Sequence, residues 1–216
     1  MLRLLFSLTS QFLFIALLED EKCLKSSQKA SFRQHSENFF PLLKQILAKT
    51  NRSLKDIKEI YFTSLPGSQV GYRISLSFGL VLQVLNPQIK CYHLNSLLFQ
   101  VGKKKAISLI SIDQRKTKYH FAVYQASKCL IEPKIIDLNT DQKRELAQIK
   151  KQFSDYLIYE DFYQISDQSS ITFSPQKIRF LTNFRQMLPY FPTIRTTKKQ
   201  IKSPNSPTPR PEKTNK

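Results

Sequence analysis

The stretch LRLLFSLTSQFLFIALL, residues 2–18, decides how this 216-residue chain begins to fold. It holds two apolar runs, residues 2–8 and 11–18, joined by the polar turn Thr9-Ser10-Gln11. Apolar runs of this length on either side of a turn are typical of buried strands. Residues 22–28 can add a third strand, so the sequence predicts an opening antiparallel meander.

The same stretch resembles a secretion signal, because Arg3 precedes a run of Leu, Phe and Ile. Polar residues interrupt that run, no small-x-small cleavage site follows it, and residues 19–21 are acidic. The other long apolar run, residues 74–85, is too short for a membrane span of about 20 residues. We therefore expect a soluble, cytoplasmic protein without a membrane partner.

A helix is predicted after the meander. Ser36, Asn38 and Pro41 mark its first turns, since proline is tolerated near a helix start. At about 100° per residue, its apolar positions sweep roughly 160° of the helix surface, which is wider than the ~100° stripe that covers a single core. These positions are Phe39, Phe40, Leu42, Leu43, Ile46 and Leu47. A partner could cover the excess.

A second helix is predicted from about Gly71 to Leu85, after a strand at residues 59–63 and a break at residues 65–68. Its apolar side chains point in every direction, whereas Gly71, Ser75 and Gly79 form one stripe of small residues. A helix that is apolar all round must be buried on all sides. Either this chain sandwiches it or a partner covers one face, and the stripe could also face the chain's own sheet.

The remaining pattern predicts strands near residues 89–94, 105–112, 118–124 and 129–136, and helices near 140–153 and 175–188. The order indicates a mixed α/β fold with two lobes. We expect a first lobe at residues 1–100, a second at 101–192, and a disordered, proline- and lysine-rich tail at 193–216.

The formal net charge is +18, of which residues 193–216 carry +6, so the body itself is basic at +12. Phosphate-bearing partners or an acidic protein surface would match this charge. A lysine-rich composition with a merely solvated surface would give the same count. Three distant cysteines, Cys23, Cys91 and Cys129, have neither metal-ligand spacing nor a disulfide pattern.

No sequence pattern indicates catalysis or a bound cofactor. His35, His93 and His120 lack the three- or four-residue spacing of paired metal ligands, and Ser68 lies in no nucleophile-elbow pattern. The segment LPGSQVGYR, residues 65–73, is not a Walker loop. It could hold an anion at a helix start or serve only as a tight turn.

Several short motifs, taken in order, resemble the bacterial TsaB (YeaZ-type) family over residues 2–125. They are Arg33-Gln34-His35-Ser36-Glu37, Pro41-Leu42-Leu43, Leu54-Lys55-Asp56-Ile57, Pro66-Gly67-Ser68, Gly71, Arg73-Ile74, Leu76 and Gly79, followed by Asp113 and Arg115. The resemblance implies an actin-like ATPase (ASKHA, RNase H-like) fold with two lobes, each with a mixed sheet and packed helices.

The resemblance also implies a role. In that family the chain pairs with a catalytic paralogue, TsaD, and a small ATPase, TsaE, to place threonylcarbamoyl groups on adenosine in transfer RNA. Where the family's first strand ends in Ile-Asp-Thr-Ser, this chain has Ser7-Leu8-Thr9-Ser10, and Gln69-Val70 replaces Phe-Thr. The resemblance implies a non-catalytic, cytoplasmic subunit with no cofactor and no metal of its own, and the missing Asp points the same way.

By the same resemblance, the two helices should dock on the catalytic paralogue. The predicted partner-binding residues are His35, Ser36, Phe39, Phe40, Leu43, Leu47, Gly71, Arg73, Ser75, Leu76 and Gly79. The alternatives are an actin-like ATPase or metallopeptidase-like enzyme, and a basic protein that binds RNA directly. Self-association through the same helices, and contact with transfer RNA either indirectly or through the basic surface, stay open.

The tail composition gives a first prediction. Deleting residues 196–216 should shift the melting temperature by less than about 2 °C, because a segment without large apolar groups buries little surface. Thermal unfolding of the full and shortened chains, followed by circular dichroism, measures this. A drop of several degrees would show that the tail is docked.

Overall fold

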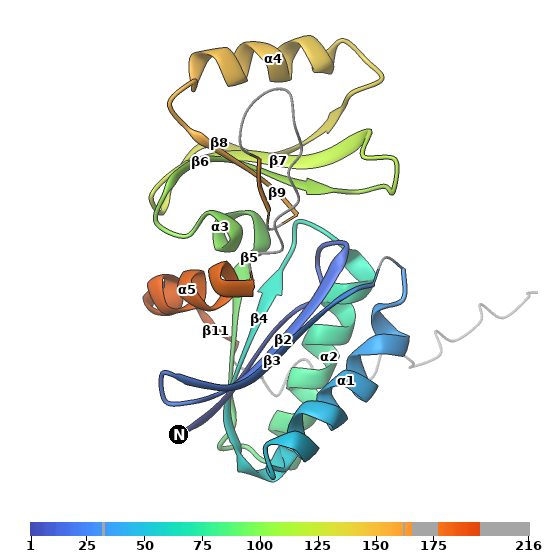
Figure 1. Cartoon of the computed structure of the whole chain (residues 1–216), viewed down its shortest axis with the longest axis vertical. Helices are drawn as coiled ribbons and strands as arrows, with labels where there is room; N and C mark the ends of the chain where they lie inside the picture. The colour runs from blue at the N-terminus through green and yellow to red at the C-terminus, as the bar shows by residue number, and fades with distance from the viewer. Residues whose placement is uncertain (32, 162, 166–176, 195–216) are drawn as a thin grey trace, which may run out of the picture.

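The computed structural model of the chain describes residues 1–31, 33–161, 163–165 and 177–194. They form two lobes, each built around one β-sheet, stacked along the long axis of the molecule (Figure 1). This confirms the two-lobed α/β architecture expected from the element order. The predicted tail lies outside the described residues, apart from Thr193 and Ile194.

The first sheet begins with the predicted meander. Strands β1 (Leu2–Ser7), β2 (Phe12–Glu19) and β3 (Lys22–Ala30) are antiparallel, and β1 and β2 pair from Leu2↔Glu19 to Ser7↔Phe14. Strands β4 (Ile57–Ser64) and β5 (Lys90–Asn95) continue the sheet in parallel with β1. With β11 (Thr193–Ile194) at the edge, the order is β11-β5-β4-β1-β2-β3.

Helices cover both faces of this sheet (Figure 1). Helices α1 (His35–Lys49) and α2 (Gln69–Leu85) lie on one face, and α5 (Lys177–Met187) lies on the other. The short helix α3 (Ser96–Val101), which the sequence analysis missed, leads into the second lobe. Single 3-10 turns are η1 (Leu54–Asp56) and η2 (Leu188–Tyr190).

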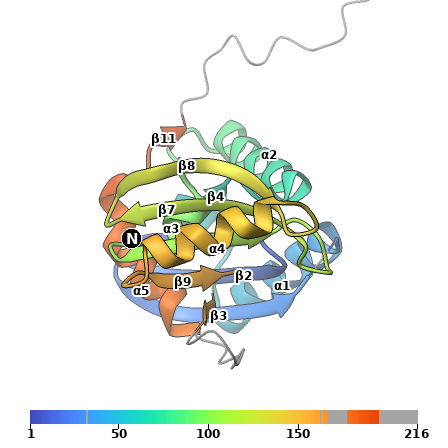
Figure 2. The ribbon, with the colours of Figure 1, turned by 90° about the horizontal axis from the view of Figure 1, so that it is seen from above.

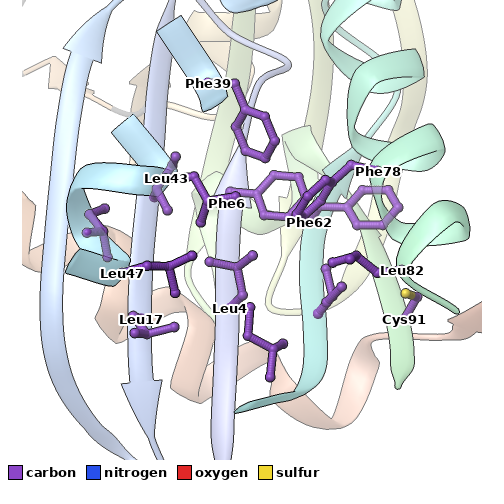
Figure 3. Packing of buried hydrophobic residues seen from close by; sticks show 14 of the residues in the cluster. Leu4, Phe6, Leu17, Phe39, Leu43, Leu47, Phe62, Phe78, Leu82 and Cys91 are labelled. Carbon is purple, nitrogen blue, oxygen red and sulfur yellow. The ribbon is translucent and has the colours of Figure 1, made fainter. Parts of the chain in front are cut away.

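The central strand β1 is buried on both faces, which explains its nearly continuous apolar sequence. Leu4 and Phe6 belong to the core beneath α1 and α2, whereas Leu5 belongs to the core beneath α5. The Phe6 ring lies 5.0 Å from the Phe39 ring, 5.6 Å from that of Phe62 and 5.9 Å from that of Phe78 (Figure 3). These aromatic contacts tie both helices to the sheet.

The second sheet repeats the arrangement of the first. Strands β6 (Lys105–Ser111), β7 (Lys118–Gln125) and β8 (Lys128–Asp137) form an antiparallel meander, and β9 (Leu157–Glu160) pairs in parallel with β6. With β10 (Tyr163–Ile165) the order is β10-β9-β6-β7-β8. Helix α4 (Gln142–Gln152) lies across one face, as the view from above shows (Figure 2). In each lobe, a helix connects the meander to the parallel strand.

The expected lobe boundary is wrong at its C-terminal side. Residues 101–192 were expected to form the second lobe, but α5 packs on the first sheet through Phe180, Phe184 and Met187. Strand β11 also pairs with β5 of the first sheet. The reason is that the face of β1 and β2 opposite α1 and α2 is apolar and must be covered, and α5 covers it. The second lobe therefore ends before α5.

A partly buried polar network joins the lobes. Gln11, in the turn after β1, donates from Nε2 to Ser111 Oγ (2.8 Å) and to the Asp113 carbonyl (3.2 Å). The Ser111 amide donates to Asp161 Oδ1 (3.1 Å), and the Ser111 hydroxyl donates to Oδ2 of the same carboxylate. Burial raises the pKa of Asp161 to about 6, partly opposed by the hydrogen bonds from Ser111. The charged form of Asp161 is thus costly in the folded chain.

This raised pKa predicts a pH-dependent stability. A carboxyl group with a higher pKa folded than unfolded favours the folded state fully below about pH 4, and this contribution is lost as pH rises through about 6. Asp161→Asn removes the titration and suits the backbone, because the φ angle of Asp161, 47°, lies in the left-handed region that asparagine tolerates. The melting temperature of the variant, relative to the parent chain, should therefore rise between pH 5 and pH 7. A difference that stays constant over this range would contradict the assignment.

Candidate partner-binding surface and interlobe cleft

Helix α1 buries most of the residues predicted to bind a partner. Phe39, Leu43 and Leu47 point into the first core, where they meet side chains from β1, β2 and α2 (Figure 3). His35 is also buried, at 4% exposure. The prediction that these four side chains form an open partner surface is therefore wrong. The wide apolar sweep of α1 is used inside the chain, because the helix contacts both the sheet and α2.

The stripe of small residues on α2 faces the chain's own sheet. A Cβ atom added to Gly71 would lie 1.7 Å from the Leu8 carbonyl oxygen, and one added to Gly79 would lie 3.2 Å from Cys91 Sγ. Ser75 is fully buried, and its hydroxyl donates to the Gly71 carbonyl (2.9 Å). These residues let α2 approach the strands closely. The prediction that the stripe admits a foreign helix is wrong, and the alternative reading, contact with the chain's own sheet, is confirmed.

The outer side of α2 remains exposed and apolar. Val81, Val84 and Leu85 are 55%, 66% and 75% exposed, and Val70 is 61% exposed. On α1, Phe40 is 53% exposed while its ring contacts that of Phe78 at 6.0 Å. We call these five residues the apolar helix surface. Large exposed apolar groups that gather on adjacent elements mark interaction sites.

The predicted residues that the structure leaves accessible flank this surface. Ser36 and Arg73 are exposed, and Leu76 is half-buried. Arg73 is the one charged residue within α2. Low charge at the centre of a contact area is typical of protein interfaces. The sequence analysis missed Val70, Val81, Val84 and Leu85. The signal that could have found them is their position on the side of α2 away from the stripe of small residues that faces the sheet.

A cleft of about 420 Å³ opens between the lobes. The turn after β1, the starts of α1 and α2, and strands β6 to β8 all contribute to it. The described residues that line it are Thr9, Ser10, Gln11, Arg33, His35, Gly67, Ser68, Gln69, Val70, Ser111, Ile112, His120 and Ile135. None of these lining residues is Asp or Glu. Leu8, which precedes the turn that lines the cleft, is fully buried.

Burial lowers the pKa of both His35 and His120, which favours the neutral form of the two imidazoles in the cleft. Ser68 has a structural task at this site. Its hydroxyl accepts a hydrogen bond from the Gly71 amide (3.1 Å) as the N-cap of α2, and its amide donates to the Thr9 carbonyl (2.8 Å). Among the described residues, no three His, Cys, Asp or Glu side chains gather as a metal site. The described lining of the cleft therefore holds hydroxyls and imidazoles but no carboxylate.

None of the helices in the described part of the chain is long and apolar enough to cross a bilayer.

Comparison with known proteins gives one family. The sequence profile described as "TsaD: tRNA N6-adenosine threonylcarbamoyltransferase" matches residues 26–201. Two relatives are tRNA threonylcarbamoyladenosine biosynthesis proteins TsaB from Buchnera aphidicola. The one from subspecies Schizaphis graminum is 21% identical over 79% of this chain and 83% of its own length. The one from subspecies Acyrthosiphon pisum is 21% identical over 82% of this chain and 81% of its own length.

Among solved structures, YeaZ from Pseudomonas aeruginosa superimposes with a TM-score of 0.51. The match has 19% sequence identity and covers 63% of this chain and 67% of YeaZ. This likeness concerns the fold. Together with the repeated sheet arrangement of the two lobes, it confirms the actin-like fold expected from the sequence.

The burial of the small-residue stripe predicts the outcome of enlarging it. Ser75→Leu and Gly79→Leu should each lower the melting temperature by several degrees, because an added side chain in a packed core typically costs 1–3 kcal/mol. Ser77→Leu is the matched control, since it adds a similar side chain at an exposed position of the same helix. If Ser75→Leu unfolds at the same temperature as Ser77→Leu, the stripe does not pack against the sheet.

Proposed function

Since this chain belongs to the TsaD family, as a member of its TsaB (YeaZ-type) branch, which serves tRNA threonylcarbamoyladenosine biosynthesis, we propose that it is a non-catalytic subunit supporting a TsaD-like transferase. It binds that catalytic paralogue through α1 and α2, and a TsaE-like ATPase joins the assembly. The transferase modifies the adenosine next to the anticodon, and this chain contributes a surface rather than reacting groups.

The apolar helix surface is the observation that carries the proposal. Val81, Val84 and Leu85 occupy the last two turns of α2, and each leaves more than half of its side chain in water. Burial of apolar side chains gives about 25 cal/mol per Å² removed from water. Covering this surface with a partner therefore stabilises the complex by that free energy. Phe40 extends the surface onto α1, so a partner that covers both helices buries one continuous area.

The composition of the cleft favours the non-catalytic role over an actin-like ATPase or a metallopeptidase-like enzyme. Phosphoryl transfer needs a carboxylate to hold the metal or orient the attacking water. Metallopeptidases need paired ligands such as two histidines one helical turn apart. The described lining of the cleft holds no carboxylate, and its two histidines come from different lobes.

The role is tested by reconstituting the reaction. Transfer RNA is incubated with the threonylcarbamoyl donor, the TsaD-like paralogue and the TsaE-like ATPase of the same cell, with and without this chain, and modified adenosine is measured by mass spectrometry after digestion. This chain alone should give no product, and its omission should reduce the yield strongly. Product formed by this chain alone, or a yield unaffected by its omission, would sink the proposal.

The partner surface is tested by charge substitution. Val84→Glu and Leu85→Glu should weaken binding to the TsaD-like paralogue by at least about tenfold, because a buried carboxylate without a partner costs more than 1.4 kcal/mol. The melting temperatures should stay unchanged, since both side chains are exposed. Isothermal titration calorimetry with purified proteins measures the affinity.

Leu130→Glu is the matched control, because Leu130 is an exposed apolar residue of β8 in the other lobe. Its affinity should equal that of the parent chain. Equal weakening by all three variants, or by none, would place the interface elsewhere. Sedimentation of this chain alone, before and after Val84→Glu, also shows whether the surface closes a homodimer when the paralogue is absent.

A further inference from the structure

A cluster of lysines occupies one end of the second lobe. We call it the lysine end, and it comprises Lys103, Lys105, Lys128, Lys150 and Lys151. Lys105 opens β6 and pairs with Gln125 of β7, which pairs in turn with Lys128 of β8. Residues in register point to the same face of a sheet, so the two lysines lie on one face, roughly 10 Å apart across two strand spacings.

Helix α4 brings two further lysines to this end. The face that carries Lys105 also carries Ile107 and Leu109, which pack with Leu146 and Ile149 of α4. The last turn of α4 holds Lys150 and Lys151, and the chain then turns into β9, whose Leu157 pairs with Ala106 (Figure 1). The end of α4 therefore lies over the starts of β6 and β9.

The remaining member, Lys103, lies beside an exposed aromatic ring. Its Nζ is 5.8 Å from the ring centre of Tyr190, which is 41% exposed. Lys104 is not part of the surface, because its Nζ donates to the hydroxyl of the buried Tyr159 (3.1 Å).

These lysines differ from others of the same lobe in their pairing. Lys116, Lys118 and Lys134 form ion pairs with carboxylates. Among the ion pairs between described residues, none includes a member of the lysine end. Asp155 is the acidic residue of the turn between α4 and β9, and Glu132 of β8 lies on the opposite face of the sheet from Lys128 and Ile131. The end therefore carries a concentrated positive charge.

We propose that the lysine end binds the phosphodiester backbone of RNA. Lysines are depleted at protein–protein interfaces, whereas they neutralise phosphates as flexible point charges. The exposed Tyr190 ring beside Lys103 offers a face on which an unpaired base can stack. Compensation of the helix dipole accounts for Lys150 and Lys151 alone. It gives no reason for Lys105 and Lys128, which come from strands.

The probe is a fluorescein-labelled, unmodified transfer RNA transcript. The choice of transfer RNA rests on the proposed function, whereas the choice of the lysine end as the binding surface rests on its charge. Binding of the full chain is measured by anisotropy over a series of salt concentrations. The variant Lys105→Gln, Lys128→Gln, Lys151→Gln removes three cations of the lysine end. The matched control Lys55→Gln, Lys58→Gln, Lys90→Gln removes three exposed cations from the far end of the first lobe.

The lysine-end variant should bind the transcript at least about tenfold more weakly near 0.1 M salt, and the slope of log K against log salt should fall by about two. The control should keep both values close to those of the parent chain. Equal affinities of the two variants for the transcript would overturn the proposal. So would a loss of poly-glutamate binding by the lysine-end variant as large as its loss of transcript binding, because that result would identify an acidic protein as the ligand. Both variants should still bind the TsaD-like paralogue, so a failure here is distinguishable from a failure of the proposed function.

Discussion

The close approach of α2 to the end of β1 is the constraint on which the rest of the structure depends. No Cβ fits at Gly71 without displacing the Leu8 carbonyl, and Ser68, as the cap of α2, is hydrogen-bonded to Thr9 in the next turn. The helix is thereby fixed against the strand along its small residues. Its larger side chains must then divide between the neighbouring helix and water.

This division of α2 connects packing with function. Phe78 turns toward α1 and meets Phe39, which completes the core, whereas Val81, Val84 and Leu85 are left outside. The same contact shapes the cleft, because the turn after β1 and the start of α2 form one wall of it. A hydrophobic Leu8 at this contact suits packing. Among the described residues, the cleft between the two lobes is lined by polar and apolar groups without a carboxylate.

The extent to which the sequence predicts the structure follows from how local each signal is. The meander of residues 2–28 and helices α1, α2 and α4 are set by apolar periodicity within one segment, and they were predicted. Helix α3 and strand β9 are too short to show a period, and they were missed. The return of α5 to the first sheet depends on an uncovered face formed by residues near the other end of the chain, which no local pattern records.

The candidate site shows the same limit. The spacing of Gly71, Ser75 and Gly79 indicates that another backbone packs closely against α2. The spacing alone does not distinguish a strand of the chain's own sheet from a helix of a partner. Phe40, Ser36 and Arg73 were predicted and are accessible, whereas His35 and Phe39 were predicted and are buried. Exposure of an apolar side chain is a property of the folded chain, so Val84 and Leu85 could be recognised only with the neighbouring elements in place.

The account's central claim is that the outer side of α2 faces the catalytic paralogue. It is tested most directly by placing a photo-crosslinking amino acid at position 84 and, as a reference, at the exposed position 130 of β8 in the other lobe, and irradiating each protein with the purified TsaD-like paralogue. The account predicts a covalent heterodimer from position 84 and none from position 130, with the crosslink mapped by mass spectrometry to a helix of the paralogue. Equal crosslinking from both positions, or crosslinking from position 130 alone, would contradict it.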